Sequence, residues 1–151
     1  MNDQLEIYKQ VILEHNKKPR NFGVLLNFDS QAEGYNPICG DHLFVSLKLS
    51  DKGEIEDVKF EGSGCAISKA SASMMTVALK GQSVATSKEI VTDFLHLLKG
   101  ELAEEEALTR IGKLKIFASI WKYPARVKCA SLAWYTFKGA LEKIQGPIST
   151  E

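Results

Sequence analysis

The sequence has no long apolar run, no excess of charge of either sign and few cysteines. Lys and Arg number 19, Asp and Glu number 19, and the formal net charge is zero. This balance argues against binding to nucleic acid or to an anionic membrane surface. No apolar stretch approaches the length of about 20 residues that a bilayer-spanning helix needs. The first ten residues contain acids and no apolar core, so we expect no secretory signal and a cytoplasmic location.

Only three cysteines are present, Cys39, Cys65 and Cys129. An odd number fits poorly with a disulfide framework, and a cytoplasmic chain would keep its thiols reduced. Their spacings of 26 residues (39 to 65) and 64 residues (65 to 129) match no zinc-finger pattern. A single free cysteine is more often a small buried apolar residue than a ligand. The residues around each cysteine must therefore indicate its role.

The rest of the composition is typical of one globular domain. The chain has 151 residues, of which 44% are hydrophobic and 25% charged, enough for a sizeable core. Alternating apolar residues predict a strand over 42–50, and the turn at 51–53 predicts a returning strand over 54–61. Ile55 is out of phase with the apolar residues that follow it. A further strand is expected over about 25–34.

Helical periodicity predicts the remaining elements. They are helices from Asp3 to about Lys17, over 66–80, from Thr86 to about Gly100, over 108–120, and from Cys129 to about Ile144. Strands come first and most helices follow, which predicts an α+β fold with a small antiparallel sheet of about three strands and helices on one face. No repeat or linker divides the chain, so residues 1–151 are expected to form one domain.

Each cysteine lies in a turn or beside an element boundary, where a thiol can reach a ligand. Cys39 precedes the alternating strand, Cys65 lies between a strand and a helix, and Cys129 lies by the start of the last expected helix. A helix N-terminus favours the thiolate, the form that attacks electrophiles and binds metals. Gly40 lets the chain turn, so that the Asp41 carboxylate can join the first thiol.

Three thiolates and one carboxylate are suited to tetrahedral zinc, and the soft sulfur atoms also suit an iron–sulfur cluster. Arg126 and Lys128 are close in sequence to Cys129 and can offset part of the negative charge of such a site. Without a neighbouring thiol, Asp41 would be read as an ordinary turn residue. The residues alone leave these alternatives open.

Three ordered blocks carry the cysteines: Asn36-Pro-Ile-Cys39-Gly-Asp41, Gly64-Cys65-Ala-Ile-Ser-Lys-Ala-Ser-Ala-Ser-Met-Met-Thr76 and Arg126-Val-Lys-Cys129-Ala-Ser-Leu-Ala-Trp134. Together they resemble the signature blocks of the IscU/SufU (NifU N-terminal-like) family of iron–sulfur cluster assembly proteins. The resemblance covers nearly the whole chain and is closer to the SufU branch. That branch has an insertion between the second and third cysteines, expected here at roughly 85–122. Lys128 stands where IscU-type scaffolds carry a histidine.

The resemblance implies a SufE/IscU-like fold and a sulfur acceptor rather than a stand-alone enzyme. It implies zinc bound by Cys39, Asp41, Cys65 and Cys129. The expected partner is a SufS-like cysteine desulfurase that uses pyridoxal phosphate. Cys39 would accept the persulfide sulfur of the desulfurase, with Arg126 in support, and the chain would stimulate that enzyme. The sulfur would then pass to a downstream iron–sulfur scaffold or apo-protein.

Two alternatives accompany this reading. The chain could be a scaffold on which Cys39, Cys65 and Cys129 hold a [2Fe–2S] cluster or iron, since ligand softness does not separate the two cases. In the other alternative, zinc is purely structural and the domain is a binding adaptor that unfolds when the metal is removed.

Overall fold

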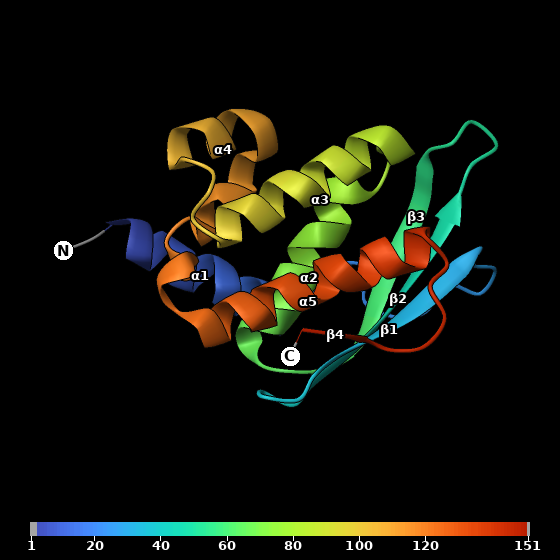
Figure 1. Cartoon of the computed structure of the whole chain (residues 1–151), viewed down its shortest axis with the longest axis horizontal. Coiled ribbons are helices and arrows are strands. Elements are labelled where there is room, and N and C mark those ends of the chain that lie inside the picture. The colour runs from blue at the N-terminus through green and yellow to red at the C-terminus, as the bar shows by residue number, and fades with distance from the viewer. Residues whose placement is uncertain (1–2, 151) are drawn as a thin grey trace.

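The computed structural model describes residues 3–150 of the chain, with side chains from Glu6 onward. Helices and strands within these residues form an α+β fold, which confirms the predicted class (Figure 1). In chain order the elements are α1 (Asp3–Lys17), β1 (Ser30–Asn36), β2 (Asp41–Leu49), β3 (Ile55–Ser63), α2 (Ala66–Leu79), α3 (Val84–Leu98), α4 (Glu104–Ile111), the 3₁₀ helices η1 (Gly112–Phe117) and η2 (Ile120–Lys122), α5 (Pro124–Leu141) and β4 (Ile148–Ser149).

The strands form one mixed sheet in the order β3-β2-β1-β4. β1 and β2 pair antiparallel, as do β2 and β3. β4 runs parallel to β1, with Gly34 opposite Ile148. The expected antiparallel sheet of about three strands is therefore extended by a fourth, parallel strand. Periodicity did not predict this strand because two residues are too few to show a pattern.

A β-bulge explains the irregular apolar pattern of β3. Lys48 pairs with Asp57 while the next residue of β2 pairs with Ile55, so one extra residue, Glu56, lies on the β3 side. The extra residue reverses the alternation of side chains. As a result Ile55 points to the same face as Val58, and both are fully buried.

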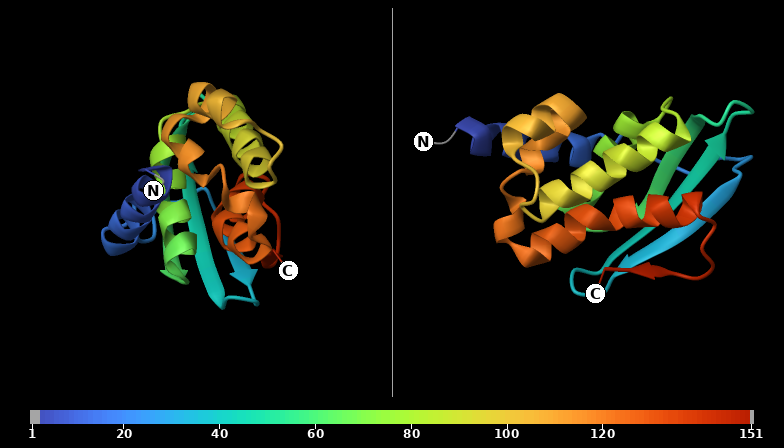
Figure 2. Two further views of the ribbon diagram at one scale, coloured as in Figure 1. Left: turned by 90° about the vertical axis from the view of Figure 1, so that its left-hand side faces the viewer. Right: turned by 45° about the horizontal axis from the view of Figure 1, so that its top comes forward.

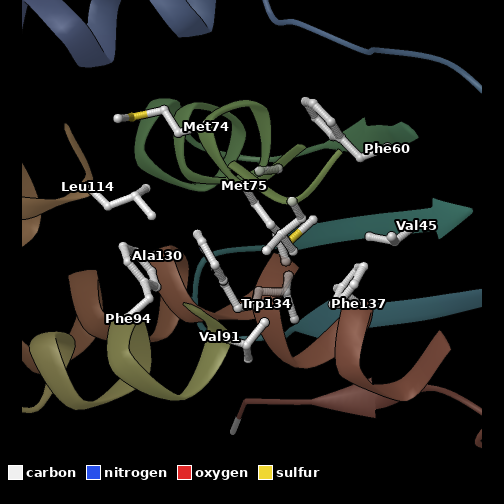
Figure 3. Packing of buried hydrophobic residues seen from close by; sticks show 14 of the residues in the cluster. Val45, Phe60, Met74, Met75, Val91, Phe94, Leu114, Ala130, Trp134 and Phe137 are labelled. Atoms are coloured by element: carbon white, nitrogen blue, oxygen red, sulfur yellow. The ribbon is translucent and has the colours of Figure 1, made fainter. Parts of the chain in front are cut away.

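Helices cover one face of the sheet (Figures 1 and 2). α2 and α5 pack directly on the strands, α3 packs on α5, and α1 packs on α2. Figure 3 shows the rings of Phe94, Trp134 and Phe137 in the buried cluster between these layers. Trp134 stacks on Phe94 with the ring centroids 4.1 Å apart, and its indole N–H donates to Ser71 Oγ at 3.0 Å. Residues of α2, α3 and α5 thus meet around one side chain.

The boundaries of α5 differ from the prediction in a way that matters for the third cysteine. The helix begins at Pro124, not at Cys129, because proline fits the first turn, where its missing N–H leaves no hydrogen bond unmade. Cys129 therefore lies inside the helix and is only 3% exposed. The prediction that Cys129 lies at the start of the helix with an accessible thiol was wrong.

Two other helix predictions also need correction. Ser83, not Thr86, caps α3, since its side chain accepts the Thr86 N–H at 3.0 Å. The single helix expected over 108–120 is instead the end of α4 followed by η1 and η2, because Gly112 has a positive φ of 56° and ends α4. The prediction of an insertion at roughly 85–122 stays a prediction. These residues form most of α3 and all of α4, η1 and η2.

Loops form hydrogen bonds along the outer side of β3. The segment 21–23 forms hydrogen bonds with both backbone polar groups of Phe60, with Gly23 N–H donating to the Phe60 carbonyl at 2.8 Å. Residues 81–82 form hydrogen bonds with both backbone polar groups of Ile55 in the same way, with N···O distances of 2.7 Å. Between them, Asp57 forms an ion pair with Lys80. No helix among the described residues is both long and apolar enough to cross a membrane.

Candidate metal centre

Three segments that are distant in sequence meet at one end of the sheet. The first is the β1–β2 hairpin, in which Asn36 pairs with Asp41. Its four-residue turn, 37–40, carries Cys39, and Gly40 closes the turn with a φ of 72°. Asp41 starts the row of side chains that faces the helices and is 0% exposed. The turn thus places an exposed thiol next to a buried carboxylate.

The hairpin meets the second turn of α5. The side-chain donor atoms of Cys39, Asp41 and Cys129 all lie within 4.8 Å of one another. The Cys129 thiol donates to the Cys39 sulfur at 3.0 Å, although 90 positions separate the two residues. Three of the four predicted ligands therefore lie close enough to share one metal ion.

Cys65 adjoins this group from the β3–α2 junction, although its sulfur is not one of the three atoms above. It is the N-cap of α2, and its sulfur accepts the Ser68 N–H at 3.4 Å. Its own backbone N–H donates to Asp41 Oδ1 at 2.9 Å. A hydrogen bond from Cys129 lowers the pKa of Cys65 to about 7, although burial opposes the shift. The same bond, together with burial, raises the pKa of Cys129 far above its ordinary value.

These opposite shifts predict unequal reactivity in the metal-free protein. We expect the rate at which iodoacetamide alkylates Cys65 to reach half its maximum near pH 7, because alkylation needs the thiolate. Cys129 should stay unreacted over the same range. Peptide mass spectrometry across a pH series measures both. Substituting Cys129→Ala removes the thiol donor, so the Cys65 midpoint should rise; a wild-type midpoint at or above about 8.5, the value of a free cysteine, would contradict the prediction.

The environment of Asp41 fits a cation. Among the side chains that the structure describes, no cationic group forms an ion pair with this buried carboxylate. Its partners are two neutral donors: the Cys65 N–H on Oδ1 and the Asn36 side-chain amide on Oδ2, at 3.1 Å. A buried carboxylate without a counter-charge is costly. A divalent cation beside the thiols would supply that charge.

Unsatisfied polar atoms gather around the same centre. Of four buried side-chain polar atoms without a hydrogen-bond partner among the described residues, three are Tyr8 Oη, Asn36 Oδ1 and Ser68 Oγ. The Asn36 side-chain amide donates to Asp41, and the Ser68 backbone N–H donates to the Cys65 sulfur. Burial raises the pKa of Tyr8, and the nearby thiols of Cys65 and Cys129 raise it further, against the effect of Arg126. Buried polar atoms without partners are rare and often mark a site for a bound ion or water.

The donor set itself suits zinc or an iron–sulfur cluster. Thiolates are soft ligands, and three thiols with one carboxylate match the count of a four-coordinate zinc site. Histidine does not take part: His42 points to the opposite face, 2.5 Å from Glu33, and His15 bonds Ser73 at 2.7 Å. Within the described part of the chain, the grouped metal donors are only cysteine and aspartate.

Arg126, the supporting residue expected from the sequence, lies at the surface in the first turn of α5. Its guanidinium carbon is 4.6 Å from the centroid of the Tyr123 ring. It does not pair with Asp41 in the described structure, where Asn36 takes that place. Sequence analysis did not single out Asn36 as a site residue. The hairpin itself could have revealed it, since a four-residue turn places residues 36 and 41 opposite each other.

Gly64 offers a test of how tightly the centre is packed. A Cβ at this position would lie 2.7 Å from Asp41 Oδ1 and 3.1 Å from Ser68 Oγ. We expect Gly64→Ala to displace the carboxylate and lower zinc affinity by about 10-fold or more. Competition with a chromophoric chelator measures the affinity. The neighbouring Ser63→Ala adds no atom near Asp41 and should bind as wild type; wild-type affinity in Gly64→Ala would show that Asp41 is not held this closely.

Comparison with known proteins agrees with this geometry. The family model of the NifU-like N terminal domain matches residues 7–130. The zinc-dependent sulfurtransferase SufU of Bacillus subtilis is 41% identical over 140 residues, covering 93% of this chain and 92% of that protein. The iron–sulfur cluster assembly scaffold protein IscU of Thermotoga maritima is 39% identical over 144 residues, covering 93% and 96%.

A solved structure shows the same fold. The crystal structure of FiSufU from Fervidobacterium islandicum matches with a TM-score of 0.81 and 32% identity, covering 93% of this chain and 99% of that one. The resemblance seen in the three cysteine blocks is thus confirmed over almost the whole chain. The chain belongs to the family of the NifU-like N-terminal domain, that of the IscU and SufU iron–sulfur cluster assembly proteins.

Proposed function

We propose that this chain is a zinc-dependent sulfur acceptor, which takes persulfide sulfur from a cysteine desulfurase and stimulates that enzyme. The observation that carries the proposal is the asymmetry of the centre. Cys39 is exposed in a turn, Cys129 is buried within a helix, and Cys65 is tied by hydrogen bonds at a helix start. One thiol can therefore leave the group while the other donors stay. The zinc-dependent sulfurtransferase at 41% identity supports the same role.

Cys39, Asp41, Cys65 and Cys129 would hold the zinc ion. Bound zinc keeps such thiols deprotonated at neutral pH. In the proposed reaction Cys39 leaves the group, and its thiolate attacks the outer sulfur of the desulfurase persulfide. A bond forms between that sulfur and Cys39 Sγ, the persulfide S–S bond breaks, and the desulfurase cysteine leaves as a thiolate. No electrons are lost or gained overall.

The proposed partner is a SufS-like cysteine desulfurase, which uses pyridoxal phosphate. Ile38, next to the accepting thiol, is 61% exposed, and Tyr123, just before α5, is 50% exposed. Exposed apolar and aromatic residues beside an arginine are typical of the centre of a protein interface. We expect Arg126 to meet negative charge on the desulfurase. The sulfur would then pass to a downstream iron–sulfur scaffold or apo-protein.

A second candidate is a scaffold on which Cys39, Cys65 and Cys129 hold a [2Fe–2S] cluster as cargo. The relative from Thermotoga maritima, which is named as a scaffold, favours it. The softness of three thiolates allows it equally. Anaerobic reconstitution with iron and sulfide, followed by transfer to an apo-ferredoxin, measures this activity. A stable, transferable cluster that displaces zinc would favour the scaffold over the sulfur acceptor.

The sulfur-acceptor proposal is tested by mixing the purified, zinc-loaded chain with the desulfurase of the same organism and following alanine release from cysteine. We expect the rate to rise with the concentration of the chain until it saturates. Protein stripped of zinc and kept reduced should stimulate less, and added zinc should restore the effect. A rate that stays at the level of the desulfurase alone would contradict the proposal.

A further inference from the structure

Among the side chains that the structure describes, Asn36 is the one that donates hydrogen bonds to both the carboxylate and the buried thiol of the centre. It is the last residue of β1 and is 0% exposed. Its amide nitrogen lies 3.1 Å from Asp41 Oδ2 and 3.7 Å from the Cys129 sulfur. A primary amide has two N–H donors, so it can serve both acceptors at once. Asn36 therefore links the carboxylate of Asp41 in the hairpin to the thiol of Cys129 in α5.

The same amide does not hold Cys39. Within the described residues that sulfur accepts a 3.0 Å hydrogen bond from Cys129, and Cys39 itself is exposed. Cys65, in contrast, is tied to Asp41 through its backbone N–H. Hydrogen bonds thus connect Asp41 to Cys65 and to Asn36, and Asn36 to Cys129. In the described part of the chain, the Cys39 sulfur has only the hydrogen bond from Cys129.

We propose that Asn36 is a positioning residue that keeps Asp41 and Cys129 in place as metal ligands when Cys39 leaves. This inference rests on the proposed function in one respect, namely that zinc occupies this centre. Asn36 need not touch the metal, because donors around a ligand orient it and raise the affinity of the whole site. With four ligands the metal itself holds the group together. With three, the group depends more heavily on the amide.

The test is a double-mutant cycle on zinc release, measured in the purified chain with an excess of chromophoric chelator and no desulfurase. The four proteins are wild type, Asn36→Leu, Cys39→Ala and the double variant. Leucine is chosen because it is close to asparagine in size but has no donor. We expect Asn36→Leu to speed zinc release by about 10-fold in the wild-type background. In the Cys39→Ala background we expect an acceleration of about 100-fold, because only three ligands remain.

A purely structural role of Asn36 predicts a different result, namely the same fold-change in both backgrounds, because independent effects add. Equal fold-changes, or no change, would overturn the proposal. Circular dichroism checks folding, and Asn36→Ala, which leaves more space, repeats the cycle if the leucine does not fit. Ser87→Ala removes a buried hydroxyl in α3, away from the centre, and should release zinc at the wild-type rate.

The outcome is independent of sulfur transfer. If the chain failed to stimulate the desulfurase but the cycle showed the expected coupling, the proposed function would fail and the role of Asn36 would stand. If stimulation were normal and the coupling absent, the reverse would hold. The two proposals are thus separated by their measurements.

Discussion

Replacing Cys39 with alanine is expected to reduce desulfurase stimulation to the rate of the desulfurase alone. The exposed thiol in the turn 37–40 is the nucleophile of the proposed transfer, and alanine has no atom that can form the new S–S bond. Asp41, Cys65 and Cys129 remain, so zinc should still bind, although less tightly. Alanine release gives the rate, and intact-protein mass spectrometry should show no added sulfur atom on the variant.

The matched comparison is Cys65→Ala, which removes a ligand but keeps the accepting thiol. It should lose zinc affinity more than it loses the ability to carry sulfur when zinc is in excess. If the Cys39→Ala protein still stimulated the desulfurase, or if the sulfur appeared on Cys65 or Cys129, then Cys39 would not be the acceptor. The reaction would have to begin at a different thiol.

The second large effect concerns stability. Trp134→Ala is expected to lower the free energy of unfolding by about 3–5 kcal/mol, the usual cost of emptying a large buried aromatic site. Trp134 is fully buried, stacks on Phe94 at 4.1 Å and donates to Ser71. This loss is a large part of the about 5–15 kcal/mol that stabilises a typical domain. Urea unfolding followed by circular dichroism measures it.

Trp121 provides the control, because the same change is made in a side chain that is 50% exposed. Trp121→Ala should cost about 1 kcal/mol or less, as surface substitutions do. Equal losses in the two variants would mean that the contacts of Trp134 do not hold α3 to α5. Because Trp134 and Cys129 share α5, unfolding of this packing would also separate the thiols.

Much of the fold could be predicted from local patterns. The alternation of Leu43, Val45 and Leu47 predicts β2, and all three are fully buried. Ile55 breaks the pattern because the extra residue Glu56 lies between it and Val58, and one residue out of phase does not by itself identify a bulge. The short β4 was missed for a related reason: its pairing depends on contact with β1 rather than on its own sequence.

The candidate site could be predicted only in part. Glycine and proline around Cys39 and Cys65 indicate turns, and the structure places both thiols there. The 3.0 Å contact between Cys129 and Cys39 could not be derived from spacing, because a separation of 90 positions does not determine a distance. The family resemblance supplied that expectation. The burial of Cys129 could not be predicted because periodicity places the helix start at Cys129, whereas α5 begins at Pro124.

The loops bound along β3 have a consequence for how this protein behaves at high concentration. An unpaired outer strand is a template onto which a neighbouring molecule can add its own strand, and repeated addition leads to aggregation or fibrils. Here the backbone groups of Ile55 and Phe60 are already bonded to residues 81–82 and 21–23, and Asp57 and Lys80 place charge between them. These contacts reduce the number of free backbone groups along β3 onto which a second molecule could add a strand.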